Sequence, residues 1–184
     1  MQKRIACCTV FVLAVAVLTL PGFSRQQDKS KRPSPPAKAE CTLPGGKTIT
    51  TDYSSPRMKG RKIFAEDGLA PFGKVWRAGA NEATTFVTTA DLTVEGKEVP
   101  AGSYTLFTIP NADKWTLIIS KKTGEWGIPY PGEQFDFARV DMKVSKLPSP
   151  VEDFTISYER SMGGCTLRMD WETTRASVTF AEKK

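Results

Sequence analysis

Four side chains that could bind a ligand lie close together in the segment VWRAGANEATTF, residues 75–86. They are Trp76, Arg77, Asn81 and Glu82. Gly and Asn tolerate the positive φ of tight turns, so the segment predicts a corner between two strands, the second starting at Thr84. In one interpretation Arg77 pairs with Glu82 across the turn and locks it. In the other, Arg77, Asn81 and Glu82 form the polar floor of a cleft with Trp76 and Trp126 as walls, which would suit a sugar or a peptide.

A second polar cluster lies earlier in the chain, in TDYSSPRMKGRKIF, residues 51–64. It places Arg57, Lys59, Arg61 and Lys62 within a short span. Such a run could coordinate a carboxylate, sulfate or phosphate group. The alternative is a basic hairpin surface whose arginines pair with Glu82 and other acids.

Several catalytic chemistries are excluded by composition, because the chain contains no histidine. Ser-His-Asp hydrolysis loses its base, and zinc or iron centres lose their usual ligand. Neither a GxxxxGK[ST] loop nor a GxGxxG turn is present, so nucleotide cofactors are not expected. We therefore predict no metal and no cofactor.

Carboxylates remain as a source of acid and base chemistry. Asp141, Asp170 and Glu172 fall on the polar register of alternating strands, where solvent exposure is expected. Asp52 and Glu82 lie among other polar groups and are the better candidates.

Short alternating runs separated by Gly, Pro and Asn fill the chain from Lys47 onward. Apolar residues alternate with polar ones around Val140–Val144, Phe154–Tyr158 and Leu167–Trp171. This period of two is typical of antiparallel strands with one face on a core. The sequence therefore predicts an all-β fold, an antiparallel β-sandwich or flattened barrel of about eight to ten strands.

The first 24 residues have the order of a secretory signal peptide. Lys3 and Arg4 precede an apolar stretch, which is followed by a Pro-Gly break and Ser24. The stretch is shorter than the roughly 20 residues of a membrane span, so an uncleaved anchor is the weaker alternative. We predict a periplasmic or secreted protein with no transmembrane anchor once the signal is removed.

Residues 25–40 contain Pro, Lys, Ser and Gln but no large apolar side chain, which predicts a disordered tether. A single β domain is then expected over residues 41–184. The net charge of +6 lies mostly in the first 40 residues. The folded part is close to neutral, so no specific nucleic-acid binding is expected.

Two cysteines, Cys41 and Cys165, remain outside the signal segment. An exported protein enters an oxidising compartment, which favours a disulfide between them. The alternative is two unpaired thiols that are buried like small apolar side chains.

Several longer motifs carry a family resemblance. The segments are SPRMKGRKIF, APFGKVWRAGANEATTF, VPAGSYTLFTIP, WTLIIS and EWG. Together they resemble the domain of unknown function 2911 family of exported bacterial proteins, over about residues 53–180. The resemblance implies a compact β-rich secreted domain and supplies no catalytic residue. Phe72 stands where members of this family usually have Tyr.

These observations favour an exported bacterial binding or scaffold module of the periplasm or cell exterior rather than an enzyme. The ligand would be a small polar molecule, a glycan or a peptide. The candidate binding residues are Arg57, Arg61, Trp76, Arg77, Asn81, Glu82 and Trp126. The alternative is a carboxylate-dependent hydrolase of glycans or peptides, in which Glu82 is acid or base and Arg57 or Arg77 holds an oxyanion. That reaction needs a second carboxyl group near Glu82.

Overall fold

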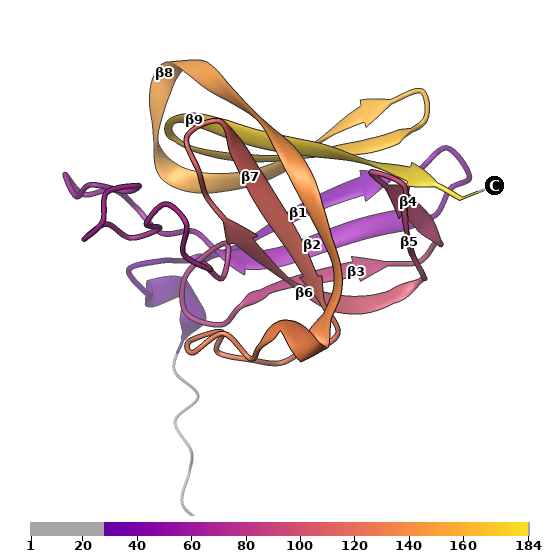
Figure 1. Cartoon of the computed structure of the whole chain (residues 1–184), viewed down its shortest axis with the longest axis horizontal. Helices are drawn as coiled ribbons and strands as arrows, with labels where there is room; N and C mark the ends of the chain where they lie inside the picture. The colour runs from indigo at the N-terminus through magenta and orange to yellow at the C-terminus, as the bar shows by residue number, and fades with distance from the viewer. Residues whose placement is uncertain (1–27, 184) are drawn as a thin grey trace, which may run out of the picture.

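Nine strands form one antiparallel sheet in the computed structural model, which describes residues 28–183 (Figure 1). They are β1 (Pro36–Thr42), β2 (Thr48–Ser54), β3 (Thr84–Thr88), β4 (Leu92–Val94), β5 (Lys97–Val99), β6 (Gly102–Ile109), β7 (Lys114–Ser120), β8 (Asp136–Ser161) and β9 (Gly164–Glu182). Two short 3-10 helices complete the fold, η1 (Lys29–Lys31) and η2 (Glu133–Phe135). The order across the sheet is β1-β2-β3-β6-β7-β8-β9-β4-β5.

The all-β, antiparallel prediction is confirmed, and the number of strands lies within the predicted range. The sheet is not closed into a barrel. Alternation places Val140 and Met142 of β8, and Leu167 and Met169 of β9, in the core. The alternation of apolar and polar residues in short runs was therefore sufficient to indicate a half-buried antiparallel sheet.

The sheet curls back on itself. Cys41 of β1 and Cys165 of β9 are joined by a disulfide, with their Cα atoms 6.3 Å apart. These strands are far apart in the sheet order, so the disulfide can form only because the sheet bends. The segment after β2 adds backbone hydrogen bonds to β8, from Met58 N–H to the Glu152 carbonyl (3.0 Å) and from Phe154 N–H to the Pro56 carbonyl (2.8 Å).

The long hairpin of β8 and β9 differs from the short strands that the sequence predicted. β8 pairs first with β7 and then with β9, and its pairing with β9 shifts register on both sides of Val151. Glu172, opposite Val151, has a φ of 53°. The irregularity breaks the alternation, so Asp170 is buried, contrary to the expected exposure. Its carboxylate accepts hydrogen bonds from Arg175 Nε (2.8 Å) and Nη2 (2.6 Å).

The predicted disorder of residues 25–40 is wrong for the described part of that segment. Residues 36–40 belong to β1, which pairs with β2 from Pro36 opposite Ser54 to Thr42 opposite Thr48. Main-chain pairing orders this edge strand without large side chains, while Ala37 and Ala39 contact the core. The predicted signal peptide, residues 1–24, lies outside the described residues. Within residues 28–183, no helix is long and apolar enough to cross a membrane.

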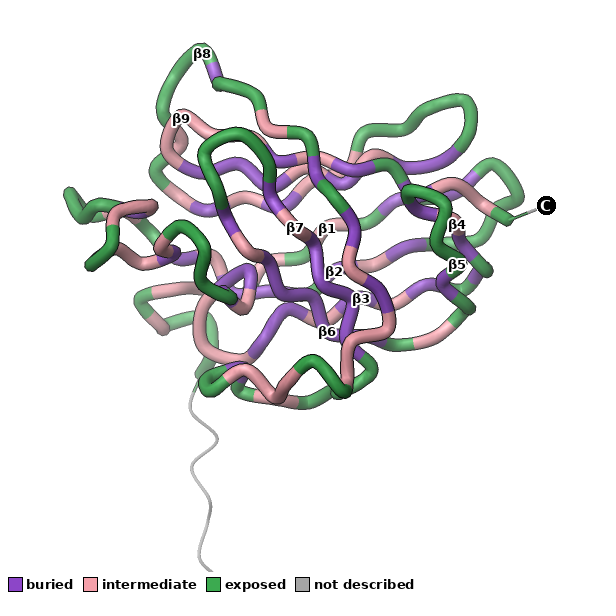
Figure 2. The backbone as a smooth tube through the Cα atoms, viewed as in Figure 1, coloured by how far each residue is buried: buried purple, intermediate pink, exposed green. Residues whose placement is uncertain are grey.

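Most strands contain buried residues, and most of these belong to one core cluster (Figure 2). Its aromatic centre is formed by Trp76, Phe154 and Trp171. The ring centroids of Trp76 lie 4.8 Å from Phe154 and 5.4 Å from Trp171. Trp76 thus anchors the segment before the predicted corner to the core, and of the corner residues Arg77, Asn81 and Glu82 are partly exposed while Ala78 and Gly79 are buried.

Candidate functional site

A corner precedes β3 as predicted, but Trp76 before it forms only an isolated bridge with Thr108 instead of a strand, and the glycine of the corner has a different role. Positive φ occurs at Ala78 (51°) and Asn81 (56°), whereas Gly79 is needed for close packing. A Cβ on Gly79 would lie 3.0 Å from Thr84 Oγ1 and 3.1 Å from the Ser54 carbonyl oxygen. The Ala80 N–H donates to that same Ser54 carbonyl at 3.0 Å, so the corner is fixed against the end of β2.

Arg77 holds two carbonyl groups together. Its Nη1 donates to the backbone oxygens of Asn81 and, at 2.9 Å, of Trp126. Burial lowers the pKa of the Arg77 guanidinium, and the charge of Glu82 opposes that shift. Arg77 therefore connects the corner to the loop between β7 and η2.

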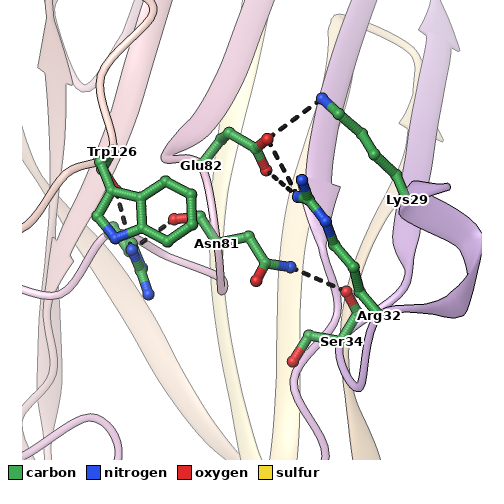
Figure 3. Close-up of polar contacts among 7 residues, drawn as sticks. Lys29, Arg32, Ser34, Asn81, Glu82 and Trp126 are labelled. Atoms are coloured by element: carbon green, nitrogen blue, oxygen red, sulfur yellow. Dashed lines mark hydrogen bonds and ion pairs between the residues drawn. The ribbon is translucent and has the colours of Figure 1, made fainter. Parts of the chain in front are cut away.

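Glu82 pairs with residues of the N-terminal segment, so the expected Arg77–Glu82 pair is not the one that forms. Arg32 Nη1 lies 2.8 Å from Glu82 Oε2 and 3.1 Å from Oε1, and Lys29 Nζ lies 3.2 Å from Oε1 (Figure 3). The amide of Asn81 donates to the Ser34 carbonyl at 3.0 Å. The corner is thus held by Lys29, Arg32 and Ser34, which belong to the segment that the sequence predicted to be a disordered tether.

The pKa of Glu82 is lowered to about 2 in this environment. A hydrogen bond from its own backbone is the largest cause, and the bonds from Lys29 and Arg32 add to it against the opposing effect of burial. The carboxylate therefore stays ionised at neutral pH. A group of this kind accepts hydrogen bonds well but is a poor general acid.

The two tryptophans proposed as cleft walls have different environments. Trp76 is only 8% exposed and belongs to the core, so its predicted place in a cleft wall is wrong. Trp126 is 53% exposed. The Arg77 guanidinium carbon lies 5.2 Å from the centre of the Trp126 ring, within cation-π range. Trp126 is thus an exposed aromatic residue whose ring and backbone carbonyl both contact Arg77.

Gly127 allows this arrangement, because a Cβ there would lie 2.9 Å from the Ala83 Cβ and 3.0 Å from the Arg77 Cβ. The Ala83 N–H also donates to the Glu125 carbonyl at 3.0 Å. The loop and the corner are therefore packed against each other.

Arg57 and Arg61 lie in another part of the molecule. Arg57 Nε is 3.1 Å from Asp153 Oδ1, and these residues form an isolated β-bridge. Arg61 donates to the carbonyls of Met58 (3.1 Å) and Arg57 (2.6 Å). Both arginines stabilise the connection after β2, and within residues 28–183 neither forms an ion pair or hydrogen bond with Glu82.

A hollow of about 300 Å³ opens beside the corner, and we name it the acidic hollow. Its lining includes Lys29, Asp52, Glu82, Thr85 and Glu125. Asp52 comes from β2, Glu82 from the corner and Glu125 from the loop that carries Trp126. Within residues 28–183, no group of three acidic or cysteine side chains is close enough together to hold a metal ion. The hollow is suited to polar groups of an organic ligand.

Lys29, Arg32 and Glu125 belong to this surface and were not among the candidate residues. Lys29 and Arg32 were missed because a Pro- and Lys-rich composition indicated disorder. Glu125 stands beside Trp126 in EWG, and this adjacency of a carboxylate and an aromatic residue was the available signal.

The fold and the site define an all-β domain with one curled antiparallel sheet, a disulfide between distant strands, and an acidic hollow beside a surface tryptophan. The chain belongs to the family described as protein of unknown function (DUF2911), whose model matches residues 34–180. The family predicted from the sequence motifs is therefore confirmed. Neither the search of curated proteins nor that of solved structures gave a match.

Proposed function

We propose that this protein is an exported, non-catalytic domain that binds a glycan at Trp126 and the acidic hollow. Export is supported by the signal-like residues 1–24 and by the disulfide between Cys41 and Cys165, which suits an oxidising compartment. The periplasm or the cell exterior of a bacterium is the proposed location.

The observation that carries the proposal is the fixed, half-exposed ring of Trp126. Arg77 holds both the backbone and the ring of this residue, so little conformational entropy is lost when a ligand stacks on it. The apolar face of a sugar ring can cover the indole, while the carboxylates of Glu82 and Glu125 accept hydrogen bonds from its hydroxyl groups.

A hydrolase is less well supported by the same surface. The hydrogen bond from its own backbone and the contacts with Lys29 and Arg32 lower the pKa of Glu82 and keep it ionised, which removes the proton that a general acid must supply. Arg57 is ion-paired with Asp153, and Arg77 donates hydrogen bonds to two backbone carbonyls, so neither guanidinium is placed to hold an oxyanion. Asp52 and Glu125 line the same hollow and supply the second carboxyl group that hydrolysis needs, but an ionised Glu82 without an oxyanion-binding arginine suits binding better than bond cleavage.

Calorimetric titration with β-1,4-linked hexamers of glucose, N-acetylglucosamine and glucosamine tests this proposal. At least one hexamer should bind, and Trp126→Ala should weaken that binding at least about tenfold, which is ~1.4 kcal/mol. Ile128→Ala is the matched control, because Ile128 is an exposed apolar residue of the same loop, and it should change affinity less than about twofold. Absence of binding by all three hexamers, or equal affinity of Trp126→Ala and wild type, would overturn the proposal.

A further inference from the structure

The acidic hollow brings together three carboxylates from separate parts of the chain. Asp52, Glu82 and Glu125 line it, and its volume of about 300 Å³ suits a group the size of one sugar residue. Glu125, which lines the hollow, directly precedes Trp126 in the loop, although the Trp126 side chain is not itself part of the lining.

One of these carboxylates lacks a bound cation. Glu82 pairs with Arg32 and Lys29, and Glu125 lies 3.7 Å from Lys122. Within residues 28–183, Asp52 has no ion pair within 4.0 Å and no side-chain hydrogen bond. Lys38, opposite Asp52 on β1, bonds instead to Glu40. Asp52 can therefore receive a positively charged hydrogen-bond donor.

An ammonium group already lies in the hollow, supplied by the chain itself. Lys29 is part of the lining, and its Nζ lies 3.2 Å from Glu82 Oε1. Lys29 comes from η1, outside the part of the chain that the family model matches. The hollow thus accepts an ammonium, and the residue that supplies it is not part of the matched domain.

Two contacts of the N-terminal segment differ in strength. Arg32 makes the closer contact with Glu82, and its side chain is only 18% exposed. The Lys29 side chain is 56% exposed, and an ion pair at that exposure adds little to stability. Arg32 can therefore keep the segment in place while Lys29 leaves the hollow.

The geometry points to an ammonium-binding subsite in the acidic hollow, which Lys29 occupies until the amino group of a ligand replaces it. This inference rests on the proposed function and specifies its ligand as a glycan with free amino groups, such as a glucosamine polymer. The charged amine would contact Asp52 and Glu82 while a sugar ring lies on Trp126.

The test compares hexamers of glucosamine, N-acetylglucosamine and glucose by calorimetry, at a pH where the amines are protonated. Wild type should bind the glucosamine hexamer at least about fivefold more tightly than the other two. Asp52→Asn should reduce that preference to less than about twofold, because it removes the charge that selects the protonated amine.

Lys29→Met supplies a second readout, because it removes the internal competitor. It should raise the affinity for the glucosamine hexamer severalfold. Lys31→Met is its matched control, since Lys31 is in the same short helix and removes the same charge but does not line the hollow. It should have a much smaller effect. Unfolding curves of all variants establish that each is folded.

The outcomes separate this inference from the proposed function. Equal affinity for charged and neutral hexamers would overturn the ammonium subsite and leave glycan binding intact. Weaker binding of the glucosamine hexamer by Lys29→Met than by Lys31→Met would overturn the role of Lys29 as an internal occupant. Absence of binding by every hexamer would overturn both proposals.

Discussion

The ion pairs and hydrogen bonds of the corner predict which pairs of substitutions are energetically coupled. Arg32→Ala and Glu82→Gln remove the two sides of one ion pair, so their effects on the free energy of unfolding should not add. Arg77→Ala removes bonds to the Asn81 and Trp126 carbonyls instead. Its effect should add to that of Glu82→Gln.

The expected change in the free energy of unfolding depends on how exposed the interacting side chains are. Arg32 contacts both oxygens of Glu82, but the Glu82 side chain is 43% exposed, so solvent screening limits the coupling to about 1 kcal/mol. Arg77→Ala on its own should cost about 2 kcal/mol, because two backbone acceptors lose a charged donor and one of them is partly buried. The coupling between Arg77 and Glu82 should stay below about 0.5 kcal/mol.

Urea unfolding of wild type, the three single variants and the two double variants measures both coupling energies. A larger coupling of Glu82 with Arg77 than with Arg32 would refute this reasoning. It would restore the pairing across the turn that the sequence alone suggests.

Three further predictions concern the disulfide, the acid stability and the processing of the chain. Replacement of Cys41 and Cys165 by Ala should lower the free energy of unfolding by up to about 5 kcal/mol, because the crosslink spans 124 residues; unchanged urea stability would contradict this. The folded pKa of Glu82, about 2, is below its unfolded value, so its stabilising effect is present above about pH 4.5 and is lost as the pH falls toward 2. Glu82→Gln should therefore lose less stability than wild type over this range in acid unfolding curves. Intact-mass measurement of the exported protein should give Arg25 as its first residue, and a full-length chain in the membrane fraction would argue against this cleavage.

The strand pattern could be predicted because it follows from the alternation of neighbouring residues. The disulfide could be predicted because the sequence indicates export to an oxidising compartment. Alternation identified the buried positions around Val140–Val144 and Leu167–Trp171, and only two cysteines were available outside the signal segment. The long bent hairpin of β8 and β9 could not be predicted, because its bulge near Val151 depends on pairing across the sheet. The burial of Asp170 follows from the same irregularity.

The site could be predicted only in part. The motif at residues 75–86 indicated a corner, and of the two tryptophans proposed as cleft walls Trp126 is exposed whereas Trp76 is buried. Its ion pairs were assigned wrongly, because Arg77 is close to Glu82 in sequence whereas Arg32 is close only after β1 has paired with β2. The composition of residues 25–40 concealed this, since edge strands and ion-paired segments need no large apolar side chain.

The most direct test of the binding proposal is an NMR titration with each of the three hexamers in turn, which follows the tryptophan indole N–H signals and is judged on the hexamer that binds most tightly. The chain has four tryptophans, of which Trp126 is exposed while Trp76, Trp115 and Trp171 are buried. The proposal predicts that the Trp126 indole signal shifts strongly with added hexamer and that the other three barely change. An unchanged Trp126 signal at saturating hexamer would contradict it.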